Sequence, residues 1–113
     1  MSTPGHTIIK NLVKTTEEGS PAWVLADMLA IEYREFRKYD RDIVRSTVKI
    51  ENIIERIQES VQEGHHIMGG VERESTDLDR LIQARQAGAH RMSQLCYNLT
   101  ELGYEISARE LGI

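Results

Sequence analysis

The sequence predicts an all-α fold: a long antiparallel helical hairpin that assembles into a helical bundle. Its only prolines are Pro4 and Pro21, so no proline forbids helix after residue 21. Apolar residues recur at alternating spacings of three and four along two long segments, as on the packed face of a helix. With 113 residues, 40% of them hydrophobic and 5% aromatic, the chain suits a single helical domain over residues 1–113 better than a sandwich or barrel.

Residues 1–20 are expected to form an N-terminal arm that contains a short helix. Four apolar residues in this arm have the spacing of one helical face. They are Ile8, Ile9, Leu12 and Val13.

The first long helix is predicted to span residues 21–63. Ser20 can cap its start, and Pro21 suits its first position. Gly64 is the first residue that is typical of a helix end. The positions that follow a heptad spacing along this helix are Leu25, Leu29, Glu32, Phe36, Tyr39, Ile43, Ser46, Ile50, Ile53, Ile57 and Ser60.

The second long helix is predicted to span residues 76–102, after a hairpin loop at residues 64–75. Thr76 is a candidate N-cap, with Asp79 three residues later as in a capping box, and Gly103 is a candidate C-cap. The apolar stripe of this helix consists of Leu78, Ile82, Ala89, Met92, Cys96 and Leu99.

A short loop between two long amphipathic helices favours an antiparallel hairpin. If Glu63 lies opposite Thr76, the second helix ends near Arg37 and leaves residues 21–36 uncovered. The N-terminal arm, the C-terminal tail at residues 104–113 and a partner subunit are the candidates to cover this overhang.

The tail contains the stretch "ISARELGI", which resembles the first half of a helix-turn-helix motif. No recognition helix follows it, so a short helix that docks on the hairpin is the favoured interpretation.

Both long helices carry more apolar surface than the seam of a hairpin needs. On the first helix a second line consists of Val44, Thr47, Ile54 and Val61. On the second helix the residues that repeat every seven positions are Leu81, Gly88, Leu95 and Leu102. Burying a large apolar side chain contributes about 1.5 to 3 kcal/mol. We therefore expect a homo-oligomer, most simply a dimer that forms a four-helix bundle, with coverage by the chain's own arm and tail as the alternative.

Charge along the first helix also indicates self-association. Residues 34–49 have a net charge of +3 and residues 51–63 a net charge of −3. The basic residues on one outer face are Arg34, Lys38, Arg41 and Arg45. The acidic residues at intervals of four are Glu51, Glu55, Glu59 and Glu63. Two copies of this helix, packed antiparallel and crossing near residue 49, would set each basic block against an acidic block; two independently solvated faces are the alternative.

Binding of a nucleotide or nucleic acid is the alternative function. With Glu63 opposite Thr76, Tyr97 faces about residue 42 and Tyr104 about residue 35, which gathers aromatic and basic side chains at one end. Stacking faces beside guanidinium groups are what such ligands require. The candidate ligand-binding residues are Tyr33, Arg34, Arg37, Lys38, Arg41, Tyr97 and Tyr104. The net charge of −4 argues against a protein that is basic over its whole surface.

The sequence does not favour an enzyme, a metal site or a cofactor. It contains no Glu-x-x-His pair of the di-iron bundles and no phosphate-binding glycine motif. Cys96 and His90 are six residues apart, on different faces of a helix, so they are not a nucleophile and its base. Adjacent His65 and His66 lack the spacing of a dedicated zinc site, and whether they bind metal is left open.

The function that these features favour is that of a non-enzymatic binding or adaptor protein. Cys96 has no cysteine partner in the chain and is expected to be a buried thiol in a reducing compartment. No signal sequence or membrane span is predicted, so a cytoplasmic location is expected. The sequence does not identify the partner or ligand, the oligomer size or the biological process.

Overall fold

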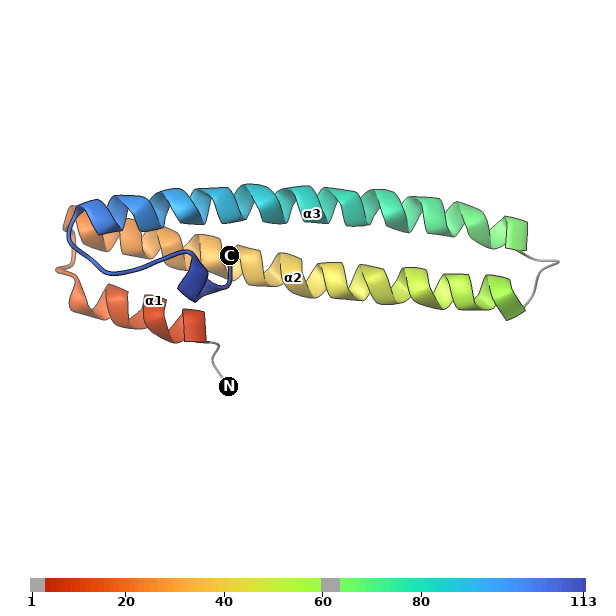
Figure 1. Ribbon diagram of the computed structural model, residues 1–113, viewed down its shortest axis with the longest axis horizontal. Helices are drawn as coiled ribbons and strands as arrows, with labels where there is room; N and C mark the ends of the chain where they lie inside the picture. Colours follow the sequence, from red (N-terminus) through yellow and green to blue (C-terminus); the bar gives the residue numbers. More distant parts are fainter. Residues whose placement is uncertain (1–3, 60–63) are drawn as a thin grey trace. The chain divides into compact units, whose positions relative to one another are not determined.

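A computed structural model describes residues 4–59 and 64–113, with the side chains described for residues 4–59 and 71–113. The described elements are α1 (Pro4–Thr15), α2 (Pro21–Glu59), α3 (Gly64–Glu101) and a single 3-10 turn, η2 (Arg109–Leu111), shown in Figure 1. Helices α2 and α3 pack against each other as an antiparallel pair, so the predicted all-α hairpin with a short N-terminal helix is confirmed.

Helix α1 has the apolar face that the sequence predicts. Ile9 and Leu12 are buried, and Ile8 and Val13 lie half-buried beside them. At its C-terminal end, the hydroxyl groups of two threonines donate to carbonyl oxygens of the last turn, and the carbonyl of Leu12 also accepts the backbone N–H of Thr16 over 3.2 Å. Thr15 Oγ1 donates to the carbonyl of Leu12, 3.2 Å away, and Thr16 Oγ1 donates to that of Val13, 3.1 Å away.

Helix α2 begins where its cap was predicted. The backbone N–H of Trp23 donates to Ser20 Oγ over 3.2 Å, which satisfies one of the N–H groups that a helix start leaves without a partner. The glycine before this cap, Gly19, has a φ of 84°, in the region that favours glycine. The predicted end of this helix at residue 63 lies outside the described residues, which reach Glu59.

Helix α3 begins at Gly64, so the prediction of a loop at residues 64–75 is wrong. Thr76 lies inside the helix and is not an N-cap, because its Oγ1 donates to the carbonyl of Glu72 over 3.0 Å. The glycines in this segment cost a helix up to about 1 kcal/mol each relative to alanine. Packing of Val71 and Leu78, both half-buried, and a hydrogen bond from Ser46 to Glu74 offset that cost.

The longer α3 also changes the register of the hairpin. Arg91 pairs with Glu32, and Arg85 pairs with Asp40. The predicted register, with Glu63 opposite Thr76, is therefore wrong by about four helical turns. The start of α2, which was expected to be left uncovered by the second helix, packs against the last turns of α3.

The chain divides into two compact units. Residues Met1–Arg37 and Gln86–Ile113 form one, here called the core unit, and Lys38–Arg85 form the other, here called the hairpin unit. The core unit contains α1, the first part of α2, the last part of α3 and the C-terminal segment with η2. The hairpin unit contains the remaining parts of α2 and α3.

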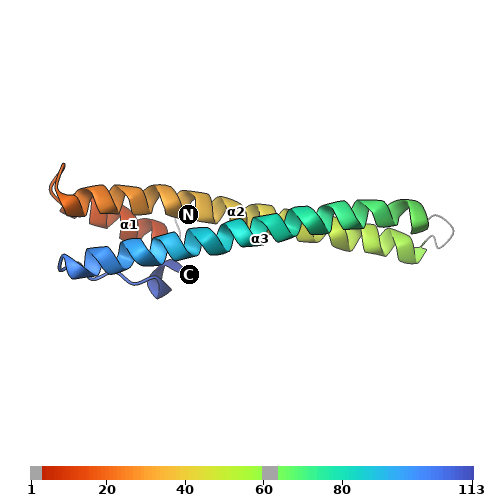
Figure 2. The same ribbon diagram turned by 90° about the horizontal axis from the view of Figure 1, so that it is seen from above.

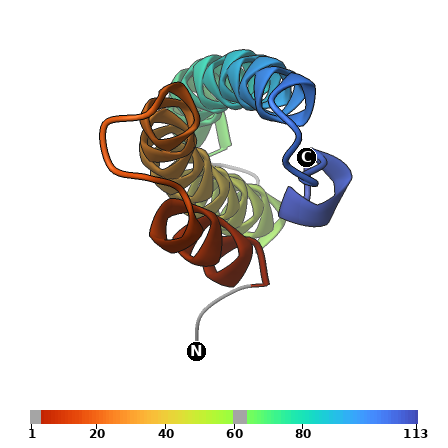
Figure 3. The same cartoon turned by 90° about the vertical axis from the view of Figure 1, so that its left-hand side faces the viewer.

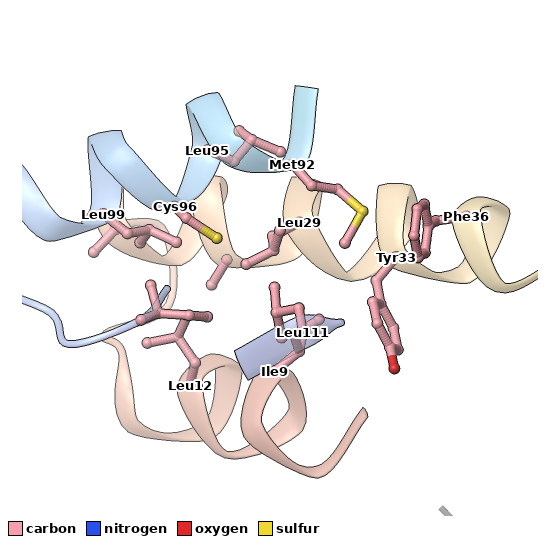
Figure 4. Packing of buried hydrophobic residues seen from close by; sticks show 13 residues of the cluster. Ile9, Leu12, Leu29, Tyr33, Phe36, Met92, Leu95, Cys96, Leu99 and Leu111 are labelled. Carbon is pink, nitrogen blue, oxygen red and sulfur yellow. The ribbon is translucent and has the colours of Figure 1, made fainter. Parts of the chain in front are cut away.

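The core unit contains one cluster of buried side chains, to which all four of its segments contribute (Figures 3 and 4). Helix α1 runs along the first part of α2 (Figure 1) and lies beneath it when seen from above (Figure 2), and it also packs against η2. The members of the cluster are Ile9, Leu12, Ala22, Ala26, Leu29, Tyr33, Phe36, Met92, Leu95, Cys96, Leu99, Ile106 and Leu111. Ala22 and Ala26 were not on the predicted stripe, because α1 and the tail add a second buried side to α2.

The C-terminal segment docks on this core, as the favoured interpretation of the tail predicts. Gly103 ends α3 with a φ of 95°, its N–H donating to the carbonyl of Thr100 and that of Tyr104 to the carbonyl of Leu99, which is a Schellman motif. Beyond it, Ile106 and Leu111 are buried to 6% and 3% exposure.

The hairpin unit has a much thinner interior. Ser46 is its only buried residue among those whose side chains are described. The apolar residues that line the seam between the two helices are only half-buried. On α2 and α3 respectively they are Ile43, Ile50, Ile53 and Ile57, and Val71, Leu78 and Leu81.

Replacing Gly5 by alanine should destabilise the fold by about 1 to 3 kcal/mol. A Cβ at this position would lie 2.5 Å from Oη of Tyr33 and 2.8 Å from its Cζ. Tyr33 is only 5% exposed, so its ring has little room to move away. Urea unfolding followed by circular dichroism measures the change in the free energy of unfolding.

Gly88→Ala is the matched control for this substitution. A Cβ there would meet only Nη2 of Arg91, at an ordinary 3.7 Å, so the variant should gain up to about 1 kcal/mol from helix propensity. Equal destabilisation by both substitutions would contradict the assignment of Gly5 as a site of close packing against Tyr33.

Candidate functional site

The outer face of α2 in the hairpin unit carries most of the charged residues that were predicted to mediate self-association. Lys38, Arg41 and Arg45 are exposed, on the side of the helix away from the seam that contains Ser46. Arg45 is 78% exposed and lies 3.9 Å from Asp42 on the same helix, a contact too open to hold its guanidinium in place. Arg34, also exposed, precedes them in the core unit.

The acidic block follows on the same helix. Glu51, Glu55 and Glu59 are all exposed, and Glu63 lies outside the described residues. On either side of Arg45, at the end of the basic block, Val44 is 61% exposed and Val48 is 47% exposed. This part of α2 therefore has apolar side chains in contact with solvent, with positive charge on one side of them and negative charge on the other.

The predicted stripe on α3 is arranged differently. Gly88 is buried and Leu95 is 7% exposed, while Leu81 is half-buried and Leu102 is 49% exposed. Because Gly88 and Leu95 are already buried within one chain, their burial gives no reason to expect a second copy there.

A groove of about 390 Å³ lies between α2 and α3 in the core unit. Its walls contain the exposed side chains of Met28 and Ile31 and the edge of buried Leu95. Across it, Nε of Arg91 donates to Oε1 of Glu32 over 2.9 Å. The remaining residues that line it are His90 and Gln94.

Sequence reasoning missed this groove, although a signal for it was present. Val24, Met28 and Ile31 follow a spacing of four and three residues, next to the predicted seam of α2. They are 45%, 47% and 54% exposed. The second line of apolar residues was sought only further along the helix, at Val44 and beyond.

The aromatic and basic residues proposed to bind a nucleotide are not gathered at one end. Tyr33 belongs to the buried core, and Tyr104 is half-buried. Tyr97 is 63% exposed but lies six residues beyond Arg91, which pairs with Glu32, so it lies nearer residue 26 than residue 42.

The described part of the chain contains neither a cluster of metal ligands nor a membrane-spanning helix. No group of three His, Cys, Asp or Glu side chains there is placed to hold a metal ion. The side chains of His65 and His66 lie outside the described residues, so the metal question at that pair stays open. None of the described helices is both long and apolar enough to cross a membrane.

Cys96 is a buried free thiol in the core unit. Burial, together with a smaller contribution from the negative charge of Glu110, raises the pKa of this thiol from 9.0 to about 11. The thiol is thus protonated at neutral pH, which suits a small core residue and not a nucleophile.

Comparison of the chain with protein-family models, with curated proteins and with solved structures finds no match in any of the three. The site is therefore interpreted from its own residues.

Cys96 should react with a thiol reagent at pH 8 about 100-fold more slowly in the folded protein than in urea, because its pKa is raised from 9.0 to about 11.

The same pKa shift should make the fold lose stability as pH rises from about 9 to 11, because in that range the Cys96 thiol ionises readily only in the unfolded chain. Unfolding measured at pH 7 and pH 10 checks this. Cys96→Ala should remove this part of the pH dependence, and an unchanged dependence in that variant would contradict the assignment.

Proposed function

We propose that this protein is a non-enzymatic, self-associating helical-hairpin protein that acts as a binding or adaptor protein through its helical faces. One observation carries the proposal. Among the described side chains of the hairpin unit, no apolar one is buried, and Val44, Val48 and Ile54 are 61%, 47% and 42% exposed.

A pair of helices with such a thin interior is a weak structure by itself. In proteins, helices are stabilised mainly by packing of their apolar faces against other elements. In the core unit, α1 and the C-terminal segment supply this packing. For the hairpin unit, a second copy of the chain supplies the apolar surface to pack against, so that the two helices become part of an assembly of four.

The groove between α2 and α3 in the core unit supports the adaptor part of the proposal. It leaves Met28 and Ile31 in contact with solvent beside a paired Glu32 and Arg91, which is the mixture of apolar and oriented polar groups found in protein interfaces. We place contact with a second protein there. The buried free thiol of Cys96 is consistent with a reducing compartment, so we assign the protein to the cytoplasm.

Binding of a nucleotide or nucleic acid stays a prediction. Only the exposed basic side chains of α2 still support this alternative function, because Tyr33 is buried and Tyr97 lies nearer residue 26 than those basic residues. Native mass spectrometry of the purified protein separates the two functions, since it reports oligomer mass and any retained ligand together.

The stability of the protein should depend on its concentration. A chain that folds fully only in an oligomer gains stability by mass action, so the melting temperature at about 200 µM should exceed that at about 2 µM by about 5 °C or more. Differential scanning calorimetry measures it. Native mass spectrometry should then give a multiple of the 12.9 kDa chain mass. A monomer with a melting temperature that is independent of concentration would overturn the proposed function.

A further inference from the structure

We propose that two copies of this chain pair antiparallel through the outer face of α2 between Arg41 and Glu55, about a two-fold axis at Val48. This inference rests on the proposed function, because it names the surface, direction and register of the same self-association.

The face has the spacing of a coiled-coil stripe. Arg41, Val48 and Glu55 are seven residues apart, and two pairs of neighbours fill the intermediate positions. These pairs are Val44 with Arg45, and Glu51 with Asn52. All of these side chains are exposed.

Helix α3 leaves this face open. It contacts α2 from the opposite side, where Oγ of Ser46 donates to Oε2 of Glu74 over 3.4 Å. A residue two positions from Ser46 points to the far side of the helix, since successive residues turn by about 100°. Val48 therefore lies away from the seam, in agreement with its 47% exposure.

The order of charges along the face is complementary to its own reverse. In an antiparallel pair centred on Val48, Arg41 faces Glu55 and Arg45 faces Glu51, and the two-fold axis repeats each pair. At the centre, Val48 of one copy packs on Val48 of the other. A parallel pair would instead place Arg41 on Arg41 and Glu55 on Glu55, so the charges select the antiparallel direction.

The same charges are unfavourable in an isolated chain. Arg41 and Arg45 are four residues apart on one helical face, as are Glu51 and Glu55, and like charges at this spacing repel each other. An opposing copy relieves both repulsions at once.

A polyanion fits this face less well than a second copy does. The basic residues that would attract phosphates are followed within about three helical turns by Glu51 and Glu55, which would repel the phosphates. The mixed sign of the face is thus the observation that favours the chain itself as the occupant.

Two charge-reversed variants test the pairing. The acidic variant carries Arg41→Glu and Arg45→Glu, and the basic variant carries Glu51→Arg and Glu55→Arg. Each should assemble at least about tenfold more weakly than the unmodified chain, because every facing pair becomes repulsive. Mixed in equal amounts, they should form a heterodimer, since all facing pairs are then attractive. Analytical ultracentrifugation and native mass spectrometry measure both results.

The control carries Arg73→Glu and Arg80→Glu, which makes the same change in net charge at exposed positions of α3 and should leave assembly unchanged. Variants that assemble like the unmodified oligomer, or that remain apart when mixed, would overturn the pairing while leaving the proposed function standing. A monomeric unmodified chain would overturn both.

A cross-link tests the two-fold axis without any change of charge. Val48→Cys should form a disulfide between two copies on mild oxidation, because the axis brings this residue next to itself. Gln58→Cys, exposed on the same helix but facing residue 38 in this register, should not. Cys96 does not compete, because it is buried. Equal cross-linking at both positions, or none at residue 48, would overturn the proposed axis.

Discussion

Two of the polar residues in the heptad pattern of the first long helix, Glu32 and Ser46, each meet a polar partner on α3. Glu32 accepts a hydrogen bond from Arg91, and Ser46 donates one to Glu74. A hairpin can slide by whole heptads and keep apolar residues on its seam, whereas these polar groups are satisfied together in one register. The Glu32–Arg91 ion pair is partly exposed and contributes little to the free energy of folding. Its importance, like that of the Ser46–Glu74 hydrogen bond, is that it favours one register over the others.

The core unit buries many apolar side chains and the hairpin unit buries none of those described, because only the core unit has further segments that pack on its two long helices. In the core unit, α1 and the C-terminal segment bury apolar side chains on a second side of α2. The hairpin unit has only the seam between its two helices, and its isoleucines remain half-buried. The proposed self-association would add the two helices of a second copy on the outer face of α2, where Val44 and Val48 are exposed, and would leave the seam itself unchanged.

The candidate sites differ in how far the sequence could predict them. The charged face of α2 depends only on residue spacing within one helix, so the sequence alone predicts that Arg41, Arg45, Glu51 and Glu55 lie on its outside, where the structure has them exposed. The predicted ligand-binding end depended on which aromatic and basic residues face each other across two helices. Because α3 begins at Gly64 and not at Thr76, the predicted facing pairs were wrong. The groove at Met28 and Ile31 depends on the same register and was missed.

The sequence by itself determined the helical class, the Ser20 cap, the Gly103 end of α3 and part of the inward face of each helix, because these follow from local backbone chemistry and from the period of a helix. Only the tertiary structure decided where α3 begins. The propensity of "HHIMGGVERES" for helix is weak, and packing against α2 outweighs the cost of its glycines. Register, the extent of the core and the position of every site shared by two helices follow from that packing, which local sequence does not encode.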